Sequence, residues 1–145
     1  MEYLVICIGN RDGGDDAIGP YIADQLKDSD IKVIDCETNP ENYTSVIKKQ
    51  NPKNLIIIDA VEMGFKPGLI RIVPKEKIGV MTISTHGMPL SIFIEYLEQY
   101  IEKIILIGIQ PKTMEGKMTE VVKKSAEELV EIIRNEEIEN ITKLD

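Results

Sequence analysis

The stretch YLVICIGNRDGGDDAIGPYIADQL, residues 3–26, contains a predicted strand, a loop and a helix in succession. Residues 3–8 form a continuous apolar run, which predicts a strand that is covered on both faces. After a glycine-rich loop, Ile18, Ile22 and Leu26 recur at helical spacing. A strand, a loop and a helix in this order are typical of α/β proteins with a mostly parallel sheet.

The rest of the chain continues this alternation. Further strands are predicted at residues 31–35, 54–58, 68–73 and 103–109, and residues 80–87 are interpreted as a strand followed by a loop. Helices are predicted from Asn39-Pro40 to Gln50, after Pro89, and over residues 118–134. We therefore expect a single domain over residues 1–145. Its fold should be a three-layer α/β sandwich, with helices on both faces of a mostly parallel five-stranded sheet.

Finer expectations concern the helix faces and the end of the chain. Val46 and Ile47 are expected on the inward face of their helix, and Val121 and Val122 on the apolar stripe of the last helix. Residues 135–145 are mostly polar, so we expect a frayed tail.

Composition excludes several classes of partner. The chain has 145 residues and a formal net charge of -8, which would repel the phosphates of nucleic acid. No apolar run approaches the roughly 20 residues that a membrane crossing needs, and the N-terminal residues do not resemble a signal peptide. Cys7 and Cys36 are far apart and are expected to be buried thiols. These features favour a cytoplasmic protein that does not insert into membranes.

The loop GNRDGGDDAIG, residues 9–19, does not fit a phosphate-binding loop. It lacks the lysine of a P-loop and the GxGxxG pattern of dinucleotide sites. Asp15 and Asp16 also stand where a phosphate would meet the helix, and two negative charges there would attract a cation instead. A structural alternative remains open, in which Asp15 caps the helix and Asp16 interacts with the helix dipole.

Two further residues complete a candidate metal site. Asp59 follows a very apolar strand, and His86, the one histidine in the chain, precedes a helix that begins after a proline. Because ligands of α/β sheets bind beyond the carboxyl ends of the strands, we expect Asp16, Asp59 and His86 to converge there. Two carboxylates and one imidazole suit an open site for a divalent transition metal. Taken singly, Asp59 could instead make a structural hydrogen bond, and His86 could have no role as a ligand.

The residues around these candidate ligands resemble a known protein family over several stretches of the chain. Gly9-Asn10, the acidic pair Asp15-Asp16 and Gly19 resemble the first loop of the maturation endopeptidases of nickel–iron hydrogenases. The likeness covers almost the whole chain and is closest to the branch that serves formate-hydrogenlyase-type complexes. It is carried further by NPENYTSVIKKQNPKNLIIIDAVEMGFKPGLIRIV (residues 39–73), STHGMPLSIFIEYL (residues 84–97) and ILIGIQP (residues 105–111).

The resemblance implies a five-stranded α/β sandwich whose metal ligands fall on Asp16, Asp59 and His86. Other branches carry glutamate at the first of these positions, so Asp16 shortens that ligand by one methylene. The implied activity is removal of a C-terminal extension from the large-subunit precursor of a nickel–iron hydrogenase. Nickel would arrive in that precursor, and zinc or cadmium could substitute for it.

Neither the residues nor the resemblance supply a separate catalytic nucleophile. The metal could polarise the scissile carbonyl or activate water, or it could position the substrate while a carboxylate acts as base. Two other functions stay open at this point: a non-catalytic chaperone that checks nickel loading, and a small-molecule-binding α/β domain.

Overall fold

The fold is built on a mostly parallel sheet. The computed structural model describes residues 2–79 and 88–145, so the strand and loop predicted at residues 80–87 lie outside the described residues. Within the described ranges, five strands pair in the order β2-β1-β3-β5-β4. They are β1 (Leu4–Cys7), β2 (Lys32–Asp35), β3 (Asn54–Ala60), β4 (Ile70–Val73) and β5 (Lys103–Ile109). Among these five described strands, only the edge strand β4 pairs antiparallel, which confirms the mostly parallel sheet that the sequence predicted.

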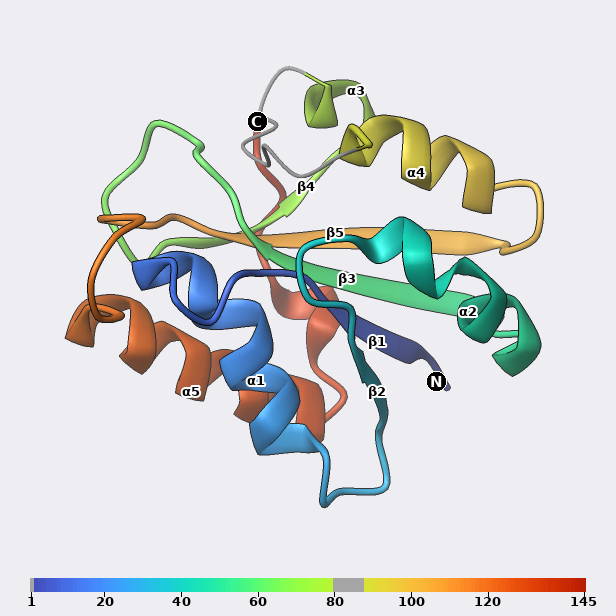
Figure 1. The fold of residues 1–145 in the computed structure, drawn as a ribbon, viewed down its shortest axis with the longest axis horizontal. Helices are drawn as coiled ribbons and strands as arrows, with labels where there is room; N and C mark the ends of the chain where they lie inside the picture. The colour runs from blue at the N-terminus through green and yellow to red at the C-terminus, as the bar shows by residue number, and fades with distance from the viewer. Residues whose placement is uncertain (1, 80–87) are drawn as a thin grey trace.

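Helices cover both faces of the sheet (Figure 1). One face carries α1 (Ile18–Leu26) and α5 (Glu120–Arg134), and the other carries α2 (Thr44–Gln50), α3 (Lys75–Ile78) and α4 (Leu90–Leu97). The described residues also form three short 3-10 segments, η1 (Gly14–Ala17), η2 (Pro40–Tyr43) and η3 (Ile138–Asn140). The three-layer prediction is confirmed. The four-residue α3 was not predicted, because it is too short to show helical periodicity.

Strand β3 shows how the two layers form. Leu55 and Ile57 belong to the apolar cluster under α2 and α4, whereas Ile56 and Ile58 belong to the cluster under α1 and α5. Successive side chains of a strand point to opposite faces. Asp59 therefore falls on the same face as Ile57, which is the face that α4 covers.

Two predicted helix faces need correction. Ile47 and Val122 are fully buried, as expected, but the side chains of their neighbours Val46 and Val121 are 44% and 43% exposed. Consecutive residues of a helix lie about 100° apart, so one of an adjacent pair can face solvent while the other faces the core. The inward faces of α2 and α5 are therefore narrower than the sequence suggested.

The expectation of a frayed tail at residues 135–145 is also wrong. Ile138, Ile141 and Leu144 are buried at a spacing of three residues. The N–H of Ile72 donates to the carbonyl of Thr142 at 2.9 Å, and the N–H of Leu144 donates to the carbonyl of Ile72 at 2.8 Å. The tail thus covers the outer edge of β4, which would otherwise leave backbone groups unpaired.

In the described ranges we found no helix long and apolar enough to cross a membrane.

Candidate functional site

Three loops gather beyond the carboxyl ends of β1, β3 and β5, on the left of the view in Figure 1. They are residues 8–13, 61–69 and 110–119, and we call this region the carboxyl edge. In parallel sheets, ligands bind in the crevice at this edge. A ligand of this protein is therefore expected at the carboxyl edge.

Two glycines hold the start of α1 against the end of β1. A Cβ atom on Gly19 would lie 2.2 Å from the carbonyl oxygen of Ile8, and one on Gly9 would lie 2.0 Å from the carbonyl oxygen of Asp16. Any larger residue at either position would force the two segments apart. This close approach brings Asp16 to the end of β1, next to β3, which pairs with β1.

Asp16 and Asp59 form a buried carboxylate pair. Their residues are only 7% and 5% exposed. The N–H of Asn10 donates to Asp16 Oδ2 at 3.1 Å, and the N–H of Ala60 donates to Asp59 Oδ1 at 2.9 Å. Burial, and then the negative charge of Asp16, raise the pKa of Asp59 well above its ordinary value, although the hydrogen bond from Ala60 acts in the opposite direction. Two adjacent carboxylates in a poorly solvated place suit a bound cation.

Asp15 has a different role from its neighbour, and it does not cap the helix as the structural alternative supposed. Its buried carboxylate instead accepts hydrogen bonds from the loop between β5 and α5. The N–H groups of Lys112 and Thr113 donate to Oδ2 at 2.8 and 3.1 Å, and the N–H of Thr119 donates to Oδ1 at 2.7 Å. The Thr119 hydroxyl lies 3.0 Å from both oxygens. We call these residues the Asp15 anchor.

Gln110 is a structural residue of the carboxyl edge that the sequence analysis did not single out. It is 3% exposed, and its Oε1 accepts hydrogen bonds from the N–H groups of Met63 at 2.7 Å and Phe65 at 3.3 Å. Its Nε2 donates to Glu62 Oε2 at 2.8 Å. Gln110 thus fixes the loop that follows Asp59. The signal that could have found it is a polar side chain directly after the apolar strand predicted at residues 103–109.

The third predicted ligand, His86, lies outside the described residues. Among residues 2–79 and 88–145, no three His, Cys, Asp or Glu side chains come together as a metal-binding group. The described part of the site therefore consists of Asp16 and Asp59, and the ligand role of all three residues stays a prediction. The pair fits a cation, because each carboxylate is buried and the two charges disfavour each other without one.

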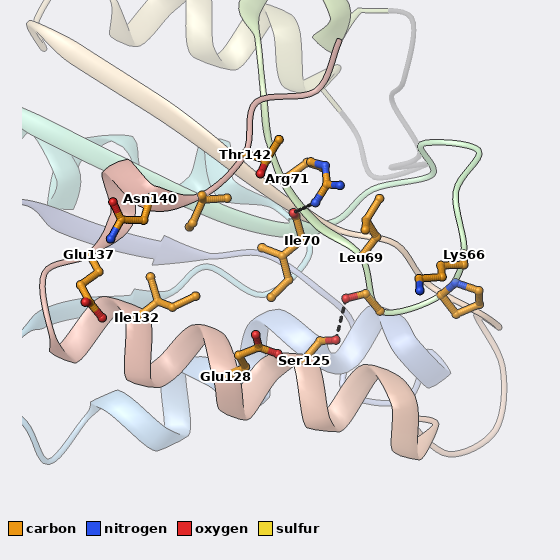
Figure 2. Close-up of a pocket in the computed structure, with 13 residues that line it drawn as sticks. Lys66, Leu69, Ile70, Arg71, Ser125, Glu128, Ile132, Glu137, Asn140 and Thr142 are labelled. Atoms are coloured by element: carbon orange, nitrogen blue, oxygen red, sulfur yellow. Dashed lines mark hydrogen bonds between the residues drawn. The ribbon is translucent and has the colours of Figure 1, made fainter.

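A separate hollow of about 490 Å³ lies between β4, α5 and the C-terminal tail (Figure 2). Ser125 Oγ donates to the carbonyl of Gly68 at 2.6 Å, and Arg71 donates to the carbonyl of Ile70 at 2.8 Å beside it. Its lining mixes bases such as Lys66 with acids such as Glu128, and it includes neither Asp16 nor Asp59. This hollow is therefore not part of the candidate site.

The fold and this site define a class: a small three-layer α/β protein with a buried carboxylate pair at the carboxyl edge of a parallel sheet. Comparison with known proteins identifies the family. The family model described as hydrogenase maturation protease matches residues 18–136, and the chain belongs to this family. The resemblance that the sequence indicated is thereby confirmed.

Individual relatives of the chain are also described as hydrogenase maturation proteases. The chain is 38% identical over 115 residues to the hydrogenase 3 maturation protease of Escherichia coli K12, which covers 77% of this chain and 74% of that protein. The solution structure of the endopeptidase HycI from E. coli matches with a TM-score of 0.90 and 33% identity, over 100% of this chain and 97% of that one. The crystal structure of the nickel–iron hydrogenase maturation protease HycI from Thermococcus kodakarensis KOD1 matches with a TM-score of 0.81 and 30% identity, over 94% and 92% of the two chains.

These likenesses place the chain among endopeptidases of hydrogenase maturation. They do not favour the two other functions that the sequence left open, a non-catalytic nickel chaperone and a small-molecule-binding domain.

Proposed function

We propose that this chain removes the C-terminal extension from the large-subunit precursor of a nickel–iron hydrogenase, after nickel has been inserted into that precursor. The names of the relatives in E. coli and T. kodakarensis support a hydrogenase as the target. We also propose that the reaction takes place in the cytoplasm, where the buried thiols of Cys7 and Cys36 would stay reduced.

The observation that carries this proposal is the buried carboxylate pair at the carboxyl edge. Asp16 and Asp59 would hold the nickel of the precursor together with His86. Two carboxylates and one imidazole leave coordination positions for donors that remain on the precursor, so the ion would be shared by the two proteins. Because none of the three ligands is a thiolate, the protease alone should bind nickel weakly. Zinc or cadmium could occupy the same site.

Two mechanisms are compatible with these residues. Bound nickel would supply Lewis acidity for peptide hydrolysis. In the alternative, the shared ion would serve only to align the scissile bond, and a carboxylate of the pair would accept the proton of the attacking water. In both, Asp16, Asp59 and His86 would position the precursor, and Gln110 holds the loop that follows Asp59.

Cleavage of a purified precursor tests the proposal directly. Wild-type protein should shorten the nickel-loaded precursor by the mass of its C-terminal extension and leave a nickel-free precursor intact. His86→Ala should lose processing, because it removes the one imidazole of the chain. Intact mass spectrometry provides the measurement, and circular dichroism verifies that the variant is folded. Normal cleavage of the nickel-free precursor, or normal cleavage by folded His86→Ala, would refute the shared-metal mechanism.

A further inference from the structure

The loop between β3 and β4, residues 61–69, is built around the buried side chain of Gln110, and we call it the Gln110 loop. Oε1 of Gln110 accepts hydrogen bonds from the N–H groups of Met63 at 2.7 Å and Phe65 at 3.3 Å. At the far end of the loop, the N–H of Gln110 donates to the carbonyl of Leu69 at 2.9 Å. One residue therefore fixes the backbone of this loop at both ends.

The Gln110 loop presents an exposed aromatic side chain. Met63 is buried in the core, but Phe65 is 50% exposed, although its N–H is held by Gln110. Between them, Gly64 turns the chain with a φ of +78°, a conformation that favours glycine. A single exposed apolar residue is ordinary on a protein surface. Here, however, a buried amide orders the backbone under the exposed ring, so little backbone freedom is lost when a ligand contacts it.

Phe65 lies beside the candidate site. Asp59 pairs with Gly108 across β3 and β5, and Gln110 follows Gly108 by two residues. One strand spacing, about 4.8 Å, two residues and one side chain thus lead from Asp59 to the N–H of Phe65. Asp59 falls on the face of the sheet that α4 covers, and the Gln110 loop rises on that same side in Figure 1. A polypeptide bound over Asp59 would therefore come within reach of Phe65.

The chemistry of Phe65 indicates what it would contact. The chain belongs to a family of proteases, so the molecule that reaches the carboxyl edge is a polypeptide. A phenylalanine ring has no hydrogen-bonding group and gains affinity by burying apolar surface. It would therefore favour an apolar side chain of that polypeptide and disfavour a charged one, whose hydration would be lost without compensation.

We propose that Phe65 is a specificity-determining residue that contacts an apolar side chain of the hydrogenase precursor near its scissile bond, and that Gln110 is the positioning residue that holds Phe65 in place. This inference rests on the proposed function. Phe65 supplies affinity for the precursor and takes no part in the chemistry, which belongs to the carboxylate pair and the metal ion.

The test compares two aromatic residues of equal exposure. Phe65→Ala removes the ring at the candidate site. Tyr100→Ala removes a ring that is also 50% exposed but stands in the turn before β5, at the opposite end of the sheet. Phe65→Leu is the conservative variant, because it keeps a large apolar side chain. Binding of the nickel-loaded precursor is measured by fluorescence anisotropy, cleavage by intact mass spectrometry and folding by circular dichroism.

Phe65→Ala should raise both Kd and KM by about tenfold and leave kcat unchanged, the size of effect expected when a central contact residue is truncated. Tyr100→Ala should leave all three constants within about twofold of wild type, as is normal outside an interface. Phe65→Leu should recover most of the affinity, because affinity here follows the apolar area that is buried.

The positioning role of Gln110 is tested by a double-mutant cycle. Gln110→Ala leaves the N–H groups of Met63 and Phe65 without their acceptor, so hydrogen exchange should speed up over residues 62–65 and KM should rise. Phe65→Ala should then add little to the KM of Gln110→Ala, because a displaced ring no longer contacts the precursor. Equal effects of Phe65→Ala in both backgrounds would show that Gln110 does not act through Phe65.

Two further results would overturn the inference. One is an unchanged Kd and KM for folded Phe65→Ala while wild type still cleaves, a result that leaves the proposed function intact. The other is a wild-type dimer in sedimentation experiments that Phe65→Ala converts to a monomer without changing precursor affinity, because a second copy would then cover the ring. Failure of wild type to cleave a precursor that it binds would count against the proposed function alone, since the anisotropy comparison still judges Phe65.

Discussion

Asp15 and Asp59 are both buried carboxylates at the carboxyl edge, yet their surroundings differ. The carboxylate of Asp15 accepts hydrogen bonds from three backbone N–H groups and one hydroxyl. Asp59 accepts one from Ala60 and faces the negative charge of Asp16. Hydrogen bonds can replace lost hydration, so the charge of Asp15 is satisfied by the fold itself. Within the part of the chain that the structure describes, Asp59 has fewer donors than Asp15, as expected of a carboxylate that binds a ligand and not of a structural one.

The largest effect should come from Asp59→Asn. We expect precursor cleavage to fall by more than about 100-fold, at least as much as when a metal ligand loses its supporting partner. The free energy of unfolding of the metal-free protein should increase, because the substitution removes a buried charge whose pKa is raised by burial and by Asp16. Cleavage is measured by intact mass and stability by urea unfolding. A variant that is less stable than wild type would show that Asp59 is a structural residue.

Asp15→Ala should mainly lower the free energy of unfolding, whereas Asp59→Asn should mainly lower cleavage. The substitution leaves the N–H groups of Lys112, Thr113 and Thr119 without their acceptor, so we expect a loss of about 3 kcal/mol in the free energy of unfolding. Hydrogen exchange should speed up over residues 112–119. Urea unfolding and exchange mass spectrometry measure the two effects. Wild-type stability together with lost cleavage would reverse the roles given to Asp15 and Asp59.

Thr119→Val sharpens the comparison within the Asp15 anchor. Valine keeps the shape of the side chain and the backbone N–H bond but removes the hydroxyl that lies 3.0 Å from both oxygens of Asp15. The expected cost is about 2 kcal/mol, typical of one hydrogen bond to a charged group. Urea unfolding provides the value. In the Asp15→Ala background the further loss should be much smaller, and an equal loss there would mean that the hydroxyl acts independently of Asp15.

The smallest effect should come from Arg11→Ala. This substitution removes the partner of two carboxylates, Asp24 and Asp35, that solvent already reaches. Arg11 contacts Asp24 and Asp35 at 2.8 Å, but its side chain is 55% exposed, so solvent screening limits the cost to about 0.5 kcal/mol. Hydrogen bonding to Arg11 lowers the pKa of Asp24 from its ordinary value of 3.8. The stabilisation is therefore present above that pH and is lost as the pH falls through the lowered pKa. Urea unfolding at neutral and acidic pH should show the difference between Arg11→Ala and wild type shrinking on acidification.

Local pattern was enough to predict the sheet and its covering layers. The apolar runs at residues 3–8 and 54–58 became β1 and β3, and the helical spacing of Ile18, Ile22 and Leu26 became the buried side of α1. These signals depend on residues that are close in sequence, which is why they can be recognised before folding. The tail could not be recognised in this way, because the burial of Leu144 depends on Ile72, its partner across the edge of β4.

By itself, the sequence determined the family, the layered α/β fold and the residues that can carry charge at the carboxyl edge. Only the tertiary structure decided what each carboxylate does. Asp15 and Asp16 are adjacent, yet one meets the N–H groups of a loop about a hundred positions away, whereas the other meets the carboxylate of Asp59. The physical reason is that the free energy of a buried charge depends on the donors and charges that folding brings around it, and neighbours in sequence supply only a few of these.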